Sequence, residues 1–290
     1  SANLGPGFDA LGMALSIYLE CRFRPSHSLL IQTSGRDADM ISTGEDNLIW
    51  QTALAVAEHA RRPMPAIELE INNDIPIGKG LGSSAAALVA GVVIADEILG
   101  LEWDRHRILD EAARIEGHPD NVAAAALGSI VASAVDSDGI TRAVRMQLPA
   151  RYGVAIIVPD FILPTSEARA VLPAAYSRAD AVFNVQRSAL LIAAMLTQTT
   201  DAFHAALEDR FHQPYRMRLV PGLEEMLHLR APGLLGCALS GAGPSVLVFY
   251  EKGHESVCEL FRDIWRQKGH ASYVLPSHIP DHGYDLMRGL

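Results

Sequence analysis

The stretch of the sequence best suited to chemistry is PIGKGLGSSAAA, residues 76–87. Its three alternating glycines permit positive φ angles and allow the backbone to approach a ligand closely. The two serines after them, Ser83 and Ser84, would open a helix whose first N–H groups are free and whose dipole attracts anions. The stretch therefore predicts a phosphate-binding loop. The alternative is a plain glycine-rich connection in which Ser83 is the N-cap of the helix.

Two well-known phosphate loops do not fit this stretch. A Walker A loop ends in Gly-Lys followed by Ser or Thr, whereas Lys79 is followed here by Gly80. A dinucleotide fingerprint that begins at Gly78 requires a glycine at the position of Ser83. The loop therefore belongs to another class.

The elements on either side must hold this loop. Residues 66–71 (AIELEI) alternate apolar and polar, which is typical of a half-buried strand. An alanine-rich helix is expected from Ser83 or Ser84 to Leu99, closed by Gly100. Further helices are predicted at 106–116, 122–127, 165–171, 179–197, 200–211 and 255–267, and strands at 152–158, 236–239 and 246–250. This mixture indicates an α+β fold, with a soft boundary near residue 150.

Composition excludes several function classes. The net charge of −10 disfavours duplex nucleic acid as a partner. Apolar runs such as 85–89 are far shorter than the ~18 residues that a membrane span needs. The three widely spaced cysteines predict reduced thiols, and we expect a cytoplasmic protein. The sequence starts without a secretory signal and without Met, so we expect it to be trimmed at this end.

Several motifs together carry a family resemblance. The pattern P-x-x-x-G-L-G-S-S-A-A resembles the central motif of the GHMP small-molecule kinases. SANLGPGFDALG (1–12) and LSGAGPSV (239–246) resemble the N-terminal and C-terminal motifs of that superfamily. Three further stretches resemble its homoserine kinases in particular: EGHPDNVAAAALG (116–128), TSEARAVLP (165–173) and PYRMRLVPG (214–222). Family members carry a short strand before S-A-N, so the resemblance also implies residues upstream of Ser1.

The resemblance implies both a fold and an activity. The fold would be the two-domain α+β GHMP kinase fold. Its N-terminal domain (1–150) would resemble ribosomal protein S5 domain 2, and its C-terminal domain (151–290) would be a ferredoxin-like α/β sandwich. The activity would be ATP-dependent phosphorylation of the side-chain hydroxyl of L-homoserine, a step toward threonine. The alternatives are a GHMP kinase for another small alcohol, such as mevalonate, and a non-catalytic ligand-binding paralogue.

For the nucleotide, the resemblance implies ATP with Mg²⁺. Ser84 and Glu116 would hold the metal, which prefers one or two carboxylates together with phosphate oxygens. Asn47 would lie near the adenine, or else serve as a turn residue or helix cap. Lys79 would flank the phosphates or be solvated. The expected loop contacts are Pro76, Ile77, Gly78, Lys79, Gly80, Leu81, Gly82, Ser83, Ser84, Ala85 and Ala86.

For the acceptor, the resemblance implies that Asn3 and Asp9 contact homoserine, with Asp9 on its ammonium group. Arg169 and Arg216 would bind its carboxylate, since Arg meets carboxylates bidentately. Turn chemistry and surface ion pairs are the alternatives for these four residues.

Asp120 and Asn121 would lie beside the amine and the reacting hydroxyl, and either one could also cap a helix. Asn121 is expected to position the hydroxyl without a strong protein base, with Asp120 as the rival base. Thr165 is expected mainly to cap its helix. The expected partners are small molecules, with a homodimer possible and with no nucleic acid or membrane.

Overall fold

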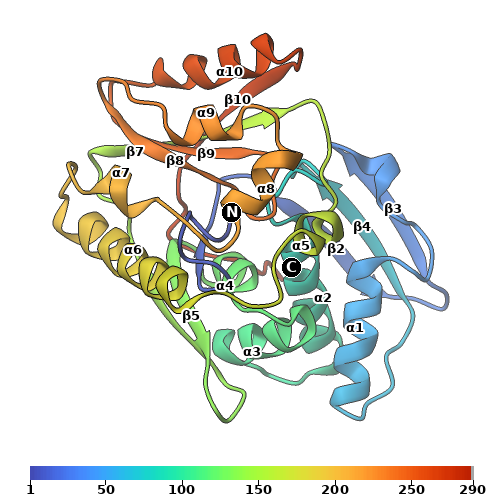
Figure 1. Cartoon of the computed structure of the whole chain (residues 1–290). Helices are drawn as coiled ribbons and strands as arrows, with labels where there is room; N and C mark the ends of the chain where they lie inside the picture. The colour runs from blue at the N-terminus through green and yellow to red at the C-terminus, as the bar shows by residue number, and fades with distance from the viewer. Residues whose placement is uncertain (289–290) are drawn as a thin grey trace.

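The computed structural model describes residues 1–288, and its described strands form three sheets (Figure 1). Two sheets lie in the N-terminal half, which we define as the chain through β6. One has the order β2-β4-β3 and contains β2 (Leu19–Pro25), β3 (Leu30–Gly35) and β4 (Ile67–Asn73). The other has the order β1-β5-β6 and contains β1 (Leu11–Met13), β5 (Ile130–Val135) and β6 (Thr141–Met146).

The helices of the N-terminal half pack around α2, which follows the glycine loop. Alanines and valines along α2 allow close packing, and a Cβ at Gly91 would lie only 2.6 Å from the carbonyl oxygen of Ile49 in α1. This close approach fixes the middle of α2 against the start of α1 and so helps to position the loop that precedes α2. The helices are α1 (Leu48–His59), α2 (Ser83–Leu99), α3 (Arg105–Glu116) and α4 (Asp120–Leu127), with a 3-10 turn at Ala38–Met40.

The C-terminal half begins at β7 and is built on one antiparallel sheet with the order β10-β7-β9-β8. Its strands are β7 (Tyr152–Pro159), β8 (Leu234–Leu239), β9 (Val246–Glu251) and β10 (Ser272–Ser277). Its helices are α5 (Thr165–Ala170), α6 (Arg178–Thr197), α7 (Phe203–Ala206), α8 (Gln213–Arg216), α9 (Leu223–Leu227) and α10 (Val257–Gln267), with a 3-10 turn at Met217–Leu219. The strand order and the helical crossovers are those of a ferredoxin-like sandwich.

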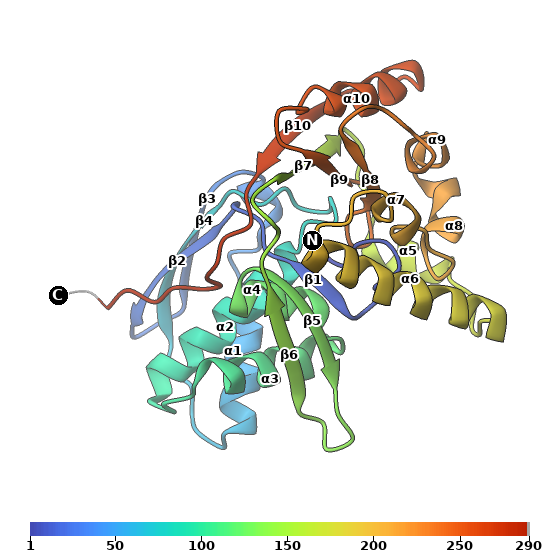
Figure 2. The ribbon, with the colours of Figure 1, turned by 90° about the vertical axis from the view of Figure 1, so that its left-hand side faces the viewer.

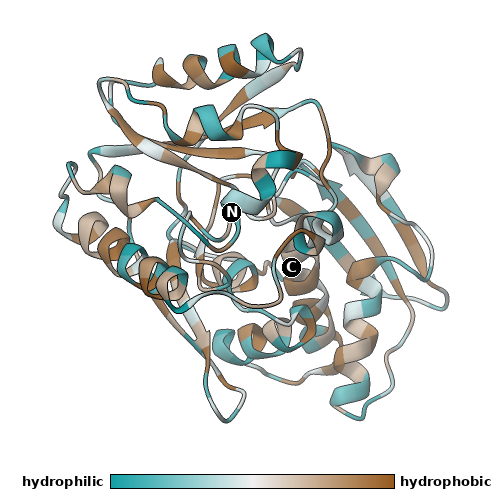
Figure 3. Cartoon of the chain, viewed as in Figure 1, coloured by the Kyte–Doolittle hydropathy of each residue, from teal (hydrophilic) through white to brown (hydrophobic). Residues whose placement is uncertain are grey.

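This sheet is buried on both faces, which explains the continuous apolar run of β7. Ile156 faces the core that contains Phe203, whereas Ile157 faces Phe261 and Trp265 of α10. The polar face of α10 stays outside, and Figure 3 shows its alternating apolar and polar residues. The predicted α+β class is confirmed.

One hydrophobic core spans both halves, beside smaller core clusters within each half, and the C-terminal segment joins the halves again. That core combines Leu4, Met13 and Ile130 with residues of the C-terminal sheet such as Ile156. After β10 the chain returns along the N-terminal half (Figure 2), where the backbone N–H of Ser129 donates to the Pro280 carbonyl at 2.7 Å. The domain boundary near residue 150 stays a prediction.

One predicted helix is wrong. The expected helix at 200–211 forms only as α7, because the carboxylate of Asp209 accepts hydrogen bonds from the backbone N–H groups of Phe211, His212 and Gln213. These three bonds start a new turn that leads into α8. The Asp209 side chain therefore accepts hydrogen bonds from the N–H groups that a continuing helix would pair with backbone carbonyls, and the helix ends.

Candidate functional site

A cavity of about 440 Å³ lies where the two halves meet. The N-terminal turn, the glycine loop, the start of α2, the junction between α3 and α4, α5 and α8 all contribute to its wall. Of the residues singled out from the sequence, the wall contains Asn3, Asp9, Asn47, Pro76, Ile77, Gly78, Gly80, Leu81, Gly82, Ser83, Ser84, Ala85, Glu116, Asp120, Asn121, Arg169 and Arg216. Lys79 and Ala86 are not part of it.

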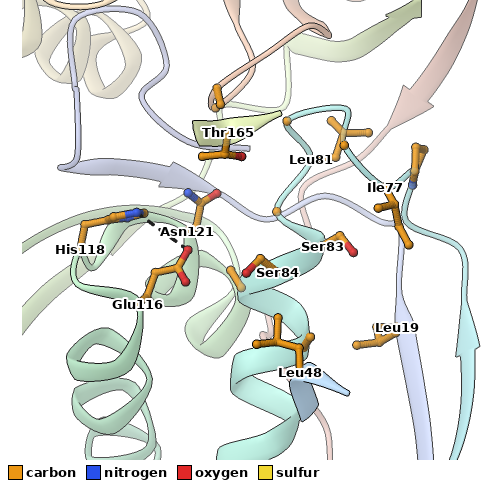
Figure 4. A pocket seen from close by; sticks show the side chains of 18 of the residues that line it. Leu19, Leu48, Ile77, Leu81, Ser83, Ser84, Glu116, His118, Asn121 and Thr165 are labelled. Carbon is orange, nitrogen blue, oxygen red and sulfur yellow. Dashed lines mark ion pairs between the residues drawn. The ribbon is translucent and has the colours of Figure 1, made fainter. Parts of the chain in front are cut away.

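The glycine loop ends at a helix start that no side chain caps. Gly82 occupies the N-cap position of α2 with φ +76°, so the alternative in which Ser83 is the N-cap is wrong. The N–H of Ala86 is the first to be used within the helix, where it donates to Gly82. Ser84 is exposed toward the cavity (Figure 4). This arrangement leaves first-turn N–H groups available to an anion.

The turn between β8 and β9 (residues 240–245), which we call the C-terminal glycine turn, packs against the glycine loop. The Ser240 hydroxyl donates to the Gly80 carbonyl at 2.8 Å. A Cβ at Gly80, where φ is +73°, would lie 2.2 Å from the carbonyl oxygen of Ser240. The loop therefore needs glycine at this position both for its φ angle and for the close approach.

Lys79 points away from the cavity. Its ammonium donates to the carbonyls of Pro159 (2.9 Å) and Phe161 (2.7 Å), at the end of β7. Burial lowers the pKa of this lysine. The side chain is therefore neither solvated nor turned toward the space where phosphates would bind, and it fastens the loop to the C-terminal half.

Glu116 ends α3 and faces the cavity opposite Ser84. Figure 4 shows both side chains directed toward the space below Asn121. Its nearest cationic neighbour among the described residues is His118, with 3.8 Å between Oε1 and Nε2. Burial raises the pKa of the Glu116 carboxyl. A partly buried carboxylate beside a free hydroxyl is a donor set that fits a divalent cation.

An acidic cluster lies next to this space. Oδ1 of the buried Asp120 accepts from Nδ1 of His118 (2.8 Å) and from the backbone N–H of Asn121 (2.7 Å). Ligand atoms of Asp9, His118 and Asp120 all lie within 4.8 Å of one another. The hydrogen bond that His118 donates to Asp120 raises the pKa of His118. The sequence alone gives no sign of this direct contact between His118 and Asp120.

Two expectations about helix caps are wrong here. Pro119 occupies the N-cap position of α4 without a side-chain bond, so neither Asp120 nor Asn121 caps that helix. Pro164 occupies the corresponding position of α5, so Thr165 does not cap it and instead lines the cavity. The side chains of Asp120, Asn121 and Thr165 therefore line the cavity instead of capping helices.

Asn3 and Asn47 both line the cavity, and the side chain of each also forms hydrogen bonds with nearby backbone groups. Asn3 (φ +70°) donates to the Gly241 carbonyl at 2.9 Å and accepts from the backbone N–H of Asp9 at 3.1 Å.

Asn47 caps α1, because its Oδ1 accepts from the N–H groups of Ile49 and Trp50. The cap role of Asn47 is therefore confirmed, and its place near an adenine stays a prediction. Beside Ser42 and Asp46, the cavity wall around Asn47 includes five apolar side chains that the sequence had not singled out: Leu19, Met40, Ile41, Leu48 and Ile71.

Two arginines converge on the cavity from the C-terminal half. Arg216 is only 2% exposed and donates from Nε to Ala168 O (3.0 Å) and from Nη1 to Gly241 O (3.1 Å). Burial, with a smaller effect from the nearby Arg169 charge, lowers the pKa of Arg216 to about 10. Nη2 of Arg169 lies 3.4 Å from Asp9 Oδ1. The pair forms a cationic side of the cavity that suits a carboxylate.

Comparison with known proteins identifies the family. The family models of the GHMP kinases N terminal domain and of the GHMP kinases C terminal domain match residues 47–129 and 191–266. A homoserine kinase of Solibacter usitatus is 69% identical, covering 99% of this chain and 95% of the relative. A homoserine kinase of Deinococcus radiodurans is 46% identical, covering 87% and 82%.

Solved structures agree with these sequence relatives. The homoserine kinase of Cytophaga hutchinsonii matches with a TM-score of 0.83 and 28% identity, covering 97% of this chain and 93% of that one. A putative homoserine kinase of Listeria monocytogenes matches with a TM-score of 0.80 and 32% identity, covering 100% and 96%. The two-domain GHMP fold is thus confirmed, and this chain belongs to the homoserine kinases of the GHMP kinase family.

Proposed function

We propose that this protein transfers the γ-phosphoryl group of ATP to the side-chain hydroxyl of L-homoserine, giving O-phospho-L-homoserine and ADP, a step in threonine biosynthesis. One observation carries the proposal: a single cavity joins an uncapped helix start to an acidic cluster and an arginine pair. The helix start suits phosphates, the acidic cluster suits an ammonium group and the arginines suit a carboxylate. An amino acid with a free hydroxyl satisfies the last two requirements together.

Phosphoryl transfer depends on position and charge more than on covalent chemistry. The first-turn N–H groups of α2 would hold the nucleotide phosphates, and the helix dipole would favour their charge. The apolar cavity wall around Asn47 supports an adenine position there. Ser84 and Glu116 would hold Mg²⁺, which when bound neutralises phosphate charge.

The acceptor would lie between the other groups. Asp9 and Asp120 would face its ammonium, and Arg169 and Arg216 its carboxylate. Asn121 lies beside the helix start, since a Cβ at Gly82 would be 3.5 Å from its Oδ1. We assign Asn121 to orienting the hydroxyl, whose proton would leave to phosphate or solvent. Asp120 Oδ1 already accepts two hydrogen bonds near 2.8 Å, which favours a binding role over that of a general base.

The alternative acceptors fit less well. Mevalonate carries a carboxylate but no ammonium group, so it would offer no cation to the carboxylates of Asp9 and Asp120, which within residues 1–288 would keep only their ion pairs with Arg169 and His118. A non-catalytic paralogue would not need Ser84 and Glu116 facing one another across the cavity.

We further propose a cytoplasmic homodimer. The helix α6 is long and apolar enough to pass as a membrane span by length and composition alone. In the fold, α6 contributes Leu191 and Met195 to the core that both halves share. Its outward side chains Val182, Val185 and Leu196 support a partner surface, and sedimentation equilibrium would test the dimer.

The experiment that tests the function measures ADP release with Mg-ATP on L-homoserine, L-serine, L-threonine and mevalonate. We expect turnover on L-homoserine to exceed the others strongly. Turnover on mevalonate would overturn the roles of Asp9 and the arginines. Tight ATP binding without turnover on any acceptor would support the paralogue instead.

A further inference from the structure

His212 is a fully buried histidine that does not line the cavity and that no step above uses. It precedes α8 and lies one helical turn before Arg216. Nε2 of His212 is 2.7 Å from the carbonyl oxygen of Gly5 in the N-terminal turn. Nδ1 of His212 is 3.1 Å from Nη1 of Arg216. The ring therefore connects the N-terminal turn to the buried arginine.

These two contacts determine the tautomer of the ring. A carbonyl oxygen can only accept, so Nε2 must carry the proton that it donates to Gly5. A guanidinium can only donate, so Nδ1 must be unprotonated in order to accept from Arg216. His212 is therefore neutral and protonated on Nε2. Burial and the adjacent arginine lower its pKa, which agrees with this state, although the Asp209 carboxylate lies 3.5 Å from Nε2.

The contact from His212 completes the restraint on the Arg216 guanidinium. Nε of Arg216 donates to Ala168, and Nη1 donates to both Gly241 and His212. Within residues 1–288 no group accepts from Nη2, and Arg216 forms part of the cavity wall. The guanidinium plane is thus fixed with its remaining donor edge free for a ligand.

The ring also supports a wall of the cavity. His212 stacks on Phe8, with 5.4 Å between ring centroids and 27° between planes. Phe8 lines the cavity, and the Arg216 guanidinium carbon lies 5.8 Å from the centroid of its ring. One buried imidazole therefore touches two elements of the acceptor side.

We propose that His212, as the neutral Nε2-protonated tautomer, is a positioning residue that orients Arg216 toward the carboxylate of the acceptor and so sets selectivity for an amino acid. This inference rests on the proposed function, in which the acceptor is an amino acid. His212 itself contacts neither substrate.

Two substitutions of His212 separate the effect of its hydrogen bond to Gly5 from that of its hydrogen bond with Arg216. His212→Asn keeps an acceptor near the position of Nδ1, whereas His212→Gln keeps a donor near the position of Nε2 and removes the acceptor for Arg216. The acceptors to compare are L-homoserine and 3-aminopropan-1-ol, which has the same ammonium and hydroxyl groups but no carboxylate. Wild-type turnover on L-homoserine first tests the proposed function independently.

For His212→Gln we expect KM for L-homoserine to rise about 10- to 100-fold, because a hydrogen bond to a charged group is lost. KM for ATP and kcat/KM for 3-aminopropan-1-ol should stay near their wild-type values. His212→Asn should raise KM for L-homoserine less than His212→Gln does, even where thermal unfolding shows it to be the less stable variant. Equal losses on both acceptors, or a larger loss in His212→Asn, would overturn the proposal and leave a purely structural role.

A measurement on the unsubstituted protein keeps the proposal testable if either variant fails to fold. ¹⁵N NMR of the histidine-labelled enzyme should show an unprotonated Nδ1 at His212, and its shift should respond to L-homoserine but not to 3-aminopropan-1-ol. A protonated Nδ1, or a response to both acceptors alike, would contradict the proposal.

Discussion

Two glutamates on α3 illustrate how the surroundings decide what the same side chain does. Glu111 is 1% exposed, and its carboxylate accepts from His59 Nδ1 (2.9 Å) and Arg114 Nε (3.1 Å). Glu116, one and a half turns later, faces the cavity, and within residues 1–288 its carboxylate forms an ion pair only with His118. The first carboxylate is satisfied within the fold, and the second is available to a ligand.

We expect Glu116→Gln to lower kcat on the order of 100-fold while the free energy of unfolding stays nearly unchanged, because it removes charge from the reaction site. Glu111→Gln is the matched control on the same helix. It should cost about 1–3 kcal/mol of stability with kcat nearly intact, because a buried hydrogen-bond network loses its charge. Steady-state kinetics and urea unfolding of both variants check this. A Glu116→Gln variant with normal kcat would remove Glu116 from the proposed metal site.

Asp120→Asn tests whether this buried aspartate binds or removes a proton. An amide keeps an acceptor for the His118 and Asn121 contacts but loses the charge that would face an ammonium group. We expect KM for L-homoserine to rise at least tenfold with kcat within a few-fold of wild type, since one charge-assisted interaction is lost. A loss confined to kcat together with a shifted pH profile would instead identify Asp120 as the general base.

At the residue scale, the sequence predicts site residues well where one motif contains them. Glu116, Asp120 and Asn121 lie within one short stretch and all reach the cavity. Residues whose role depends on distant partners could not be predicted. Lys79 bonds carbonyls 80 and 82 positions later in the chain, and His212 bonds one 207 positions earlier. Local spacing contains no information about such pairs.

At the element scale, the glycine loop depends on its contact with the C-terminal glycine turn. Gly80 and Gly139 both have φ near +75°, but only Gly80 has a neighbour at van der Waals range. We expect Gly139→Ala, in the turn between β5 and β6, to cost about 1–2 kcal/mol from left-handed strain alone. Gly80→Ala should cost clearly more and should also raise KM for ATP, because its Cβ would collide with the Ser240 carbonyl.

Urea unfolding and ATP titration of the two variants measure the difference. Equal stability losses with an unchanged KM for ATP would mean that the glycine loop does not depend on its contact with the C-terminal glycine turn.

Helices and strands with a regular apolar pattern, or with a glycine or proline that ends them, could be predicted from the sequence. The helix α2 and its end at Gly100 (φ +59°) agree with expectation, as does the buried strand β7. Six strands were not predicted: β1, β2, β3, β5, β6 and β10. β3, β6 and β10 are only partly buried and have no regular apolar alternation, whereas the alternation in β2 (LECRFR) could have indicated that strand. Tertiary pairing, rather than local propensity, decides these segments.

At the scale of the whole molecule, the two halves should unfold as one unit. Chains of this length often unfold domain by domain. Here, however, Leu4, Met13 and Ile130 belong to the same core cluster as Ile156 and Phe203, so neither half keeps a complete core alone. The C-terminal segment adds to this link, since the Arg105 and Arg145 guanidinium groups donate to the backbone carbonyls of Tyr284 and Asp281.

Tryptophans in each half can report on this coupling. A variant that keeps only Trp50, in α1, and one that keeps only Trp265, in α10, should each show the same urea midpoint by fluorescence as by far-UV circular dichroism. Gly283→Ala should lower both midpoints together, by about 1–3 kcal/mol in unfolding free energy, because its Cβ would lie 2.1 Å from the Ala126 carbonyl oxygen and displace the segment. Two separated midpoints would mean that each half is stable by itself. In that case the cavity between them could open without global unfolding, and acceptor binding would have to stabilise one half against the other.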